Sequence, residues 1–352
     1  MNIAPESHAY NIPMRLMNLA MTKKFNSPIP SDVELIRCYG GSVSHAALDP
    51  LLSTFRTPGI DGLIGFLVVR RCAVVQGDPI CAPEYKTSLA DAFSRYCANK
   101  GWSILYSAAT EPMHAYARKH GYATMQFAEL LIANPQHDPE LERRGRHLRQ
   151  HLNHVRRTGL VVREYLGNTK PNAQLETQIQ ATYEQWLTAR HGLQMHLGQQ
   201  HLFANKSGRR WFVADQSGNV VGMLSMLHIE CFESHHLINI VFSSPSAPLY
   251  SNELMVVTAL QALREEGVHS VCLGVGPLAA LGQIEGCHGM TEFLARKLYQ
   301  LAATAMNLHG RTVFWEKYHI TQREPLYLLF QSPRIGLREL NALFKALHCS
   351  VT

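Results

Sequence analysis

The chain has 352 residues, a formal net charge of +6 and 46% hydrophobic residues. This composition excludes a largely disordered protein, and the length suffices for two domains of ordinary size. No apolar run reaches the ~18 residues that a membrane-spanning helix needs, and the start, MNIAPESHAY, lacks the basic and then apolar layout of a signal peptide. We therefore expect a cytoplasmic protein that has no transmembrane segment and makes at most peripheral contact with the inner membrane surface.

The cysteines and histidines do not indicate a disulfide framework or a metal site. The eight cysteines are scattered, without a Cys-x-x-Cys pair, which suits a reducing compartment. The 19 histidines include no His-Glu-x-x-His and no cluster with cysteine at zinc-ligand spacing. We accordingly expect neither a metal nor another cofactor.

Apolar periodicity and turn residues predict a first series of helices and strands. In chain order these are a helix at Met14–Phe25, a helix at Ser31–Tyr39, two hairpin strands at Leu63–Val69 and Arg71–Gln76, a helix at Thr87–Lys100, a strand at Ser103–Ala108, a helix at Glu111–His120 and a strand at Met125–Ile132. A turn-forming segment, Gly77–Pro83, follows the hairpin, and we expect Asp78 within it to stabilise the turn.

The same kind of series then restarts. Its members are a strand at Leu160–Tyr165, a helix at Asn172–Leu187, hairpin strands at Trp211–Ala214 and Val220–Ile229, a strand at Leu237–Phe242, a helix at Asn252–Glu266, a strand at Ser270–Leu273, a helix at Thr291–Leu308 and a strand at Pro325–Phe330. Both series contain the run β-β-α-β-α-β, so we predict an α/β protein built from mixed sheets flanked by helices. The predicted parts are a first domain at 1–135 with an N-terminal helical extension, a connecting helix at 136–160 and a second domain at 161–352.

The connection between the two series is a strongly basic segment, Asp138–Gly159. Asp138 and Pro139 are typical of a helix start, and Gly159 is typical of a helix stop. The apolar stripe is thin, so one narrow side can pack on the protein while a wide cationic side faces outward. Six arginines are candidate contacts to phosphates of a nucleic acid: Arg143, Arg144, Arg146, Arg149, Arg156 and Arg157. The alternative is an ordinary solvated surface helix.

Short motifs occur in a fixed order along most of the chain. They are Tyr39-Gly40, Gly77-Asp78-Pro79, Gly121-Tyr122, LRQHLNHVRRTG at Leu148–Gly159, LGVGPL at Leu273–Leu278, FWEKY at Phe314–Tyr318 and EPLYL at Glu324–Leu328. In this order and spacing the sequence resembles, over residues 31–330, the C-terminal catalytic domain of phosphatidylglycerol lysyltransferases and their soluble relatives, formerly a domain of unknown function.

The resemblance implies two tandem acetyltransferase-like (GNAT-like) domains and an aminoacyltransferase reaction, with the catalytic cleft in the second domain. The donor would be an aminoacyl-tRNA, and the acceptor either a phosphatidylglycerol-type lipid or a small molecule with an amine, hydroxyl or hydroxylamine group. The basic segment suits a tRNA donor, because it offers a cationic surface that reads phosphates and shape. The chain also lacks the Gly-rich pyrophosphate turn typical of acyl-CoA-dependent acetyltransferases.

The resemblance also implies candidate site residues. Lys317 corresponds to the second lysine of the family's Phe-Lys-x-Lys-Phe segment, and is a candidate catalytic residue that neutralises the ester oxyanion, the leaving oxygen or the terminal phosphates; the alternative is an ordinary surface lysine. Glu253 corresponds to the family's acidic residue after the central strand, where it would bind an amino group or simply favour a helix N-terminus. In a splayed central sheet, four further positions would lie near the reacting ester: Asn239, Ser243, Gly274 and Gly276.

Two departures from the family pattern concern the acceptor. Where the family usually has Asp-Leu-Met-Arg on the central strand, this chain has Asn239-Ile240-Val241-Phe242, and Trp315 replaces the family's first lysine. An amide cannot act as a base and a phenyl ring cannot pair with a phosphate, so we predict a less ionic, more apolar site that includes Phe242. The general base is left unidentified. Two other functions stay open: an acyl-CoA-dependent N-acyltransferase, and a non-catalytic module that binds tRNA or a membrane surface.

Overall fold

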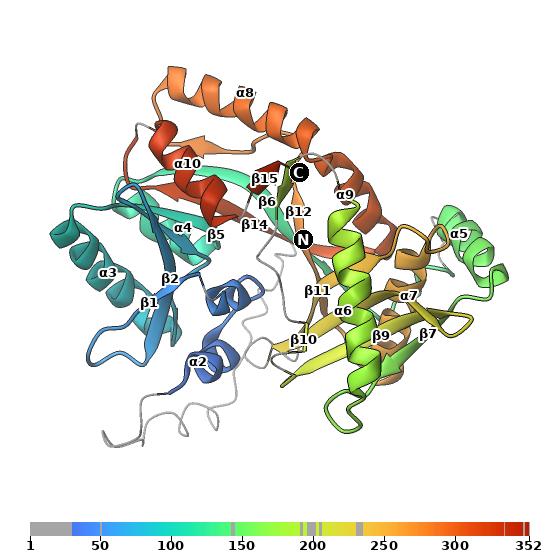
Figure 1. Ribbon diagram of the computed structural model, residues 1–352. Helices are drawn as coiled ribbons and strands as arrows, with labels where there is room; N and C mark the ends of the chain where they lie inside the picture. The colour runs from blue at the N-terminus through green and yellow to red at the C-terminus, as the bar shows by residue number, and fades with distance from the viewer. Residues whose placement is uncertain are drawn as a thin grey trace, which may run out of the picture. The chain divides into compact units, whose positions relative to one another are not determined.

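The computed structural model describes residues 30–49, 51–141, 145–190, 193–195, 202–203, 206–229, 235–333, 335–347 and 349–351. The chain divides into two compact units, Met1–Ser31 and Asp32–Thr352, and the elements below belong to the second unit (Figure 1). The helix predicted at Met14–Phe25 lies outside the described residues.

The first series of elements agrees closely with the prediction. Its helices are α2 (Asp32–Tyr39), η1 (Ser44–Leu48), η2 (Pro83–Tyr85), α3 (Lys86–Lys100) and α4 (Glu111–Lys119). Its strands are β1 (Ser53–Phe55), β2 (Gly62–Val69), β3 (Cys72–Gln76), β4 (Ile80–Cys81), β5 (Ser103–Ala109) and β6 (Ala123–Ala133). The helix α3 ends as predicted because Gly101 takes a left-handed conformation, with φ of 67°.

The second series contains more elements than predicted. Its helices are α5 (Arg146–Arg157), α6 (Ala173–Thr188), α7 (Ser251–Glu265), α8 (Gly289–Ala305), α9 (Leu308–Trp315), η4 (Glu316–Tyr318) and α10 (Leu337–Ala346). Its strands are β7 (Val161–Tyr165), β8 (Leu193–Met195), β9 (Arg209–Gln216), β10 (Asn219–Ile229), β11 (His235–Ser243), β12 (Val271–Pro277), β13 (Ile284–Glu285), β14 (Ile320–Phe330) and β15 (Cys349–Val351). The single helix predicted at Thr291–Leu308 is wrong at its end, because Asn307 takes a left-handed conformation that separates α8 from α9.

The basic helix is shorter than predicted, since it begins at Arg146 rather than at Asp138. Asp138 instead closes a local turn, in which its Oδ1 accepts the backbone N–H of Glu140 at 2.8 Å. The preceding chain then approaches the helix closely at Gly145, where a Cβ would lie only 2.0 Å from the carbonyl oxygen of Pro139. Only glycine permits this approach, which brings Glu140 alongside α5.

One mixed sheet joins the two series, in the order β1-β2-β3-β5-β14-β6-β12-β11-β10-β9-β7 (Figure 1). The series exchange strands: β14 of the second series lies between β5 and β6 of the first, while β6 lies between β14 and β12. The two exchanged strands are antiparallel to each other. The predicted mixed α/β fold is therefore confirmed. The domain boundaries at 135 and 161 stay a prediction. Hydrogen bonds of the sheet, such as those between β6 and β14, join strands from both sides of these boundaries.

Helices cover both faces of each half of the sheet. In the second half α7 packs on β9, β10 and β11, and α5 contributes Leu148, Leu152 and Val155 to the same core. The helix α6 covers the opposite face of β10 and β11, where Trp211 and Phe242 lie in a separate core. In the first half α3 and α10 belong to two different cores on either side of β3 and β5.

Candidate functional site

The parallel strand pair of the second half is splayed. The strands β11 and β12 pair only at His236 with Val271 and at Leu237 with Cys272. Beyond these positions they separate, so the region has the splayed central sheet that the family resemblance implies. The opening lies between the C-terminal ends of two strands, which is where ligands bind in many α/β folds.

Asn239 lies at this opening, in a β-bulge. The neighbouring strand β10 pairs Ser225 with Ile240 and Met226 with Ile238, which leaves Asn239 as the extra residue of β11. A bulge turns the side chain of its extra residue out of the regular alternation. Across the opening, Gly274 takes φ of 108°, and a Cβ there would lie 3.8 Å from the carbonyl oxygen of Ile238. Asn239 and Gly274 therefore lie on facing sides of the splay.

Lys317 and Glu253 meet in a partly buried ion pair. Glu253 lies in the first turn of α7, the helix that follows β11, and it is buried. Lys317 lies in η4, directly after the helix α9 that packs on β12. Its Nζ donates to Glu253 Oε1 at 2.8 Å and stands 5.2 Å from the centre of the Phe314 ring. The pair thus joins the first turn of α7, which follows β11, to η4, which follows the helix that packs on β12.

A histidine of the basic helix completes this group. His151 Nδ1 lies 3.7 Å from Glu253 Oε1, and the His151 ring stacks on Tyr250 with ring centres 3.8 Å apart. Burial and the positive charge of Lys317 lower the pKa of His151 below its ordinary 6.5, while Glu253 acts in the opposite direction. The imidazole is therefore mostly neutral at pH 7 and able to accept a proton. We call Glu253, Lys317 and His151 the Glu253 cluster.

Unpaired polar atoms occur in the Glu253 cluster and in its sequence neighbours. Burial, assisted by the negative charge of Glu253, raises the pKa of Tyr318 well above its ordinary value. Within the part of the chain that the structure describes, Tyr318 Oη, Asn252 Oδ1 and His151 Nδ1 are buried without a hydrogen-bond partner. Buried polar atoms are usually paired, and here His151 belongs to the cluster itself while Asn252 and Tyr318 are the sequence neighbours of Glu253 and Lys317.

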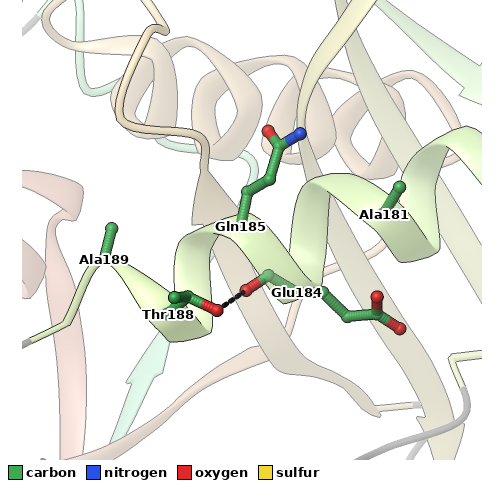
Figure 2. A pocket seen from close by; sticks show the side chains of 5 residues that line it. All are labelled: Ala181, Glu184, Gln185, Thr188 and Ala189. Carbon is green, nitrogen blue, oxygen red and sulfur yellow. Dashed lines mark hydrogen bonds between the residues drawn. The ribbon is translucent and has the colours of Figure 1, made fainter.

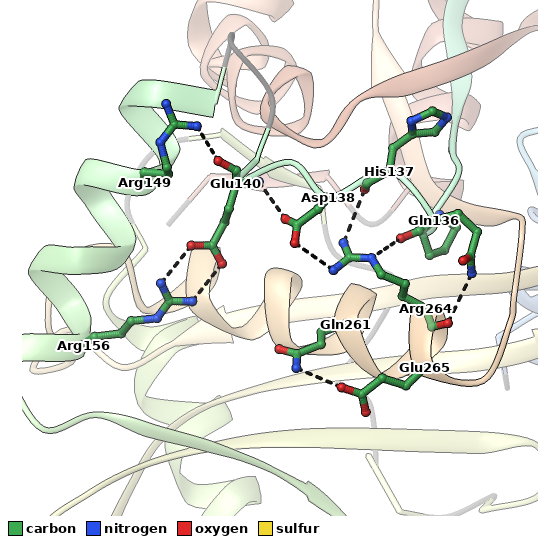
Figure 3. A network of polar contacts seen from close by, with 10 residues as sticks. Gln136, His137, Asp138, Glu140, Arg149, Arg156, Gln261, Arg264 and Glu265 are labelled. Carbon is green, nitrogen blue, oxygen red and sulfur yellow. Dashed lines mark hydrogen bonds and ion pairs between the residues drawn. The ribbon is translucent and has the colours of Figure 1, made fainter.

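Two candidate phosphate-binding arginines are already engaged by the protein, as Figure 3 shows. Arg156 makes two hydrogen bonds of 2.8 Å to the Glu140 carboxylate, and Arg149 donates to the Glu140 carbonyl oxygen. Arg264 of α7 holds the same segment by an ion pair with Asp138 at 2.9 Å. A nucleic acid on this face would therefore compete with Glu140 for Arg156.

The other candidate arginines are differently placed. Arg146 and Arg157 are exposed at the two ends of α5. Arg143 and Arg144 lie outside the described residues. The contact of all these arginines with tRNA stays a prediction, for which Arg146 and Arg157 are the positions most open to solvent.

Phe242 lies in the core rather than at an accessible surface. Its side chain is fully buried, with its ring centre 5.2 Å from that of Tyr183 and 5.7 Å from that of Trp186. Both partners belong to α6. Packing against α6 accounts for the phenyl ring in structural terms, and its role in substrate binding stays a prediction.

Gly276 and Ser243 also have structural neighbours that account for them. A Cβ at Gly276 would lie 2.6 Å from Leu131 Cδ1, so any larger residue there requires the Leu131 side chain to shift. Ser243, the last residue of β11, pairs with Gly222 of β10. Their predicted proximity to a substrate is not tested by these contacts.

A hollow of about 540 Å³ lies elsewhere, along α6. Figure 2 shows its lining residues Ala181, Glu184, Gln185 and Thr188 on that helix, with Ala189 directly after its end. The Thr188 hydroxyl is engaged with the Glu184 carbonyl oxygen at 2.9 Å. The lining brings together no acid, base and nucleophile from different elements, and so suggests no chemistry.

A metal-ligand group and a membrane-spanning helix are both absent from the described residues. They include no group of three or more histidine, cysteine, aspartate or glutamate side chains placed to hold a metal ion. They also include no helix with the length and apolar character that crossing a membrane requires.

His151 is the candidate-site residue that sequence reasoning missed. It follows Leu148 by three positions and precedes Val155 by four, so it lies beside the buried stripe of α5 rather than on its outward face. That spacing could have indicated from sequence that His151 faces the protein. The many other histidines and arginines of the segment concealed it.

Solved structures of two bacterial proteins have the same fold over nearly the whole chain. The protein described as L-PGS from Bacillus licheniformis is 18% identical, with a TM-score of 0.73, and the match covers 92% of this chain and 98% of that one. The C-terminal domain assigned to a lysylphosphatidylglycerol synthetase of Agrobacterium fabrum is 17% identical, with a TM-score of 0.69 and coverage of 90% and 96%. The expected fold of acetyltransferase-like halves is confirmed.

The sequence comparisons address the family directly. No curated protein matches this chain in sequence. The family model described as phosphatidylglycerol lysyltransferase, C-terminal, matches residues 34–330. This match spans most of the chain and includes every member of the Glu253 cluster. The chain therefore belongs to the phosphatidylglycerol lysyltransferase C-terminal family.

Proposed function

We propose that this member of a transferase family moves an aminoacyl group from a charged tRNA to an acceptor hydroxyl or amine at the Glu253 cluster. The observation that carries the proposal is the 2.8 Å pair of Lys317 and Glu253, next to a neutral His151 and beside the splay of β11 and β12. Family membership supports the reaction class, because the family is named for transfer of a lysyl group.

Each member of the cluster has a task in this reaction. The acceptor oxygen or nitrogen attacks the carbonyl carbon of the aminoacyl ester, and His151 takes the proton that the acceptor loses. The carbonyl oxygen becomes negative in the tetrahedral intermediate, and the Lys317 ammonium offsets that charge. When the intermediate collapses, the ester C–O bond breaks and the ribose oxygen leaves with the proton from His151.

The surrounding residues position these groups. Glu253 orients Lys317 through the 2.8 Å hydrogen bond, and Tyr250 holds the His151 ring by stacking. Asn239, at the bulge, is suited to hydrogen-bond the α-amino group of the donor. Backbone N–H groups near Gly274 would provide further donors to the oxyanion.

The placement of His151 connects the chemistry to the donor. The helix α5 carries both His151, on its inner side, and the exposed Arg146 and Arg157 at its two ends. A tRNA that binds the outer side of α5 would therefore contact the same helix that supplies the proposed base. Phosphate contacts of this kind give affinity with little dependence on base sequence.

The test is loss of the aminoacyl group from radiolabelled tRNAs. The pure protein is incubated with a panel of aminoacyl-tRNAs, separately with a total lipid extract and with a water-soluble small-molecule extract. We expect extract-dependent deacylation of one tRNA species, with the label recovered in the acceptor. The extract that supports the reaction distinguishes a phosphatidylglycerol-type lipid from a small amine or hydroxylamine.

The opposite result is equally clear. If every charged tRNA remained intact with both extracts, the proposed donor would be wrong. Stabilisation of the protein against heat by an acyl-CoA, with none by charged tRNA, would then favour the acyl-CoA-dependent reaction. Binding of tRNA irrespective of its aminoacylation would favour a module without catalytic activity.

A further inference from the structure

Two histidines lie directly opposite each other on the neighbouring strands β10 and β11. The register of this antiparallel pair places His228 beside His236, and their ring centres are 5.0 Å apart. With metal–nitrogen bonds of about 2.0–2.1 Å, two imidazoles bound to one ion have ring centres roughly 5 Å apart. The two rings are therefore spaced like a pair that chelates a metal ion. Their separation along the chain matches no common zinc motif, so only the strand pairing brings the two rings together.

His236 has an unpaired nitrogen in the protein interior. The residue is only 8% exposed, and within the described part of the chain its Nδ1 is buried without a hydrogen-bond partner. Burial is the main reason that the pKa of His236 falls to about 4, so the ring is neutral at pH 7. Buried polar atoms are usually paired, and neutral imidazole is the form of histidine that binds metal ions. His228 is only partly buried, which gives an ion access to the pair from solvent.

The charges near the two rings favour a cation. Arg210 of β9 pairs with Glu164 at 2.7 Å and with Glu266 at 2.7 Å, so this group carries one negative charge in excess. The charges of all three residues influence the pKa of His236, which places the group near its ring. Glu266 also directly follows α7, and the C-terminal end of a helix carries a negative partial charge. A bound cation would therefore be attracted by both the ion-pair group and the helix end.

The donor set indicates the kind of ion. Imidazole nitrogens suit borderline cations such as Zn²⁺ or Cu²⁺, whereas Mg²⁺ and Ca²⁺ prefer oxygen ligands. In the described residues no third histidine, cysteine or carboxylate is placed to bind the same ion. Binding should accordingly be weaker than in zinc sites with three or four protein ligands.

We propose that His228 and His236 form a binding site for a borderline divalent metal ion such as Zn²⁺ or Cu²⁺. One nitrogen of each ring binds the ion, and water completes the coordination. The ion ties β10 to β11 at His236, which is one of the two β11 residues that pair with β12 before the splay. It would thus stabilise the closed base of the opening between β11 and β12.

The proposed metal site is distinct from the Glu253 cluster. Glu253 lies in the first turn of α7, whereas Glu266 follows the last residue of that helix. At the rise of an α-helix, this separation along α7 corresponds to about 20 Å. The ion therefore has no direct contact with the proposed chemistry, and the inference goes beyond the proposed function without depending on it.

The experiment is a Zn²⁺ titration of the full chain, first freed of metal by a chelator, in competition with a chromophoric zinc indicator. We expect one equivalent of Zn²⁺ to bind at least about tenfold more weakly to His228→Gln than to the unchanged protein, because the variant has lost one of two linked ligands. Zn²⁺ should also raise the melting temperature of the unchanged protein more than that of the variant. Mg²⁺ should do neither.

Two further variants separate metal binding from a structural role of the histidine. His228→Cys should retain Zn²⁺ binding, since a thiolate is also a zinc ligand. His309→Gln, which replaces an exposed histidine of α9, should bind Zn²⁺ like the unchanged protein. Thermal melting in the absence of metal checks that each variant is folded.

Absence of Zn²⁺ binding by the unchanged protein would overturn the metal site, and so would equal binding by His228→Gln. An equal loss of binding in His309→Gln would overturn it as well, because the ion would then be held elsewhere. Zn²⁺ binding that depends on His228, without consumption of any charged tRNA, would support the metal site while the proposed function failed. Aminoacyl transfer by a protein that binds no Zn²⁺ would overturn the metal site alone.

Discussion

Each half of the sheet contains a parallel strand pair, and the two pairs differ in how far they stay together. In the first half β3 and β5 stay paired from Cys72 to Gln76. The Gln76 amide is buried and donates to the Ala346 carbonyl oxygen at 3.0 Å, which closes this end of the pair. In the second half β11 and β12 separate after two residues and Asn239 lies in a bulge. The first pair stays closed along its length, whereas the second is open at the place where we propose that the substrate binds.

The carboxylates near these pairs differ in the same way. Asp78, after β3, accepts the Thr110 hydroxyl at 2.6 Å, the Thr110 N–H at 2.9 Å and Lys86 Nζ at 3.2 Å. It ties a turn to the start of α4, which agrees with the expected structural role. Glu253 instead pairs with Lys317 from a distant part of the chain and lies near a neutral histidine. Under the proposed function, the first carboxylate is structural and the second belongs to the reacting site.

The largest expected effect tests this assignment with two lysines. Lys317→Met should lower the rate of aminoacyl transfer about 10²–10³-fold, because the variant has no positive charge opposite the developing oxyanion. Lys86→Met, the matched change beside Asp78, should leave the rate within a few-fold. Single-turnover transfer from charged tRNA measures both. Equal losses, or full activity of Lys317→Met, would contradict the division between the halves.

A second test replaces the two amides. Gln76→Leu should lower the free energy of unfolding by roughly 1–3 kcal/mol, since it leaves the buried Ala346 carbonyl unpaired, without a specific effect on transfer. Asn239→Leu should instead slow aminoacyl transfer and leave the free energy of unfolding nearly unchanged. Urea unfolding followed by fluorescence gives the first quantity. Destabilisation by the Asn239 change alone would indicate that the bulge, too, is structural.

A third and smaller effect concerns tRNA affinity. The double variant Arg146→Glu, Arg157→Glu should bind tRNA several-fold more weakly, and the slope of log affinity against log salt should fall by roughly 0.7–0.9 for each arginine that binds a phosphate in the unchanged protein. The control changes Arg70 and Arg95, two exposed arginines of the first half, to glutamate. Filter binding over a range of salt measures the slopes. Identical slopes for the two double variants would remove α5 as the tRNA-binding surface.

The smallest expected effect is a change in one titration. Burial and Lys317 lower the pKa of His151, so its ring should lose its proton at a pH below 6.5. In Lys317→Met the pKa should rise, because the positive charge that opposes protonation is gone while Glu253 remains. NMR titration of the imidazole, assigned by its absence in His151→Gln, measures this directly. A lower pKa in Lys317→Met would contradict the arrangement of the Glu253 cluster.

Much of the local structure was predictable from sequence because it depends on neighbouring residues. Gly101 ends α3 by its left-handed conformation, and Asn172 begins α6 by accepting the Leu175 N–H at 3.1 Å. The hairpin of β2 and β3 follows from alternating apolar residues. The candidates Lys317 and Glu253 came from family resemblance, and their meeting at 2.8 Å could not be read from positions 64 residues apart.

The sequence by itself determined the fold class, the two repeated series of elements and the family, since these depend on periodicity, turn residues and ordered motifs. Only the tertiary structure decided the exchange of β6 and β14, the shortening of α5 and the grouping of His151 with Glu253 and Lys317. These features arise from contacts between residues far apart in the chain, such as the close approach of Pro139 to Gly145 and the packing of α5 on α7. Local patterns set what each segment can form, whereas burial of their shared surfaces decides which segments meet.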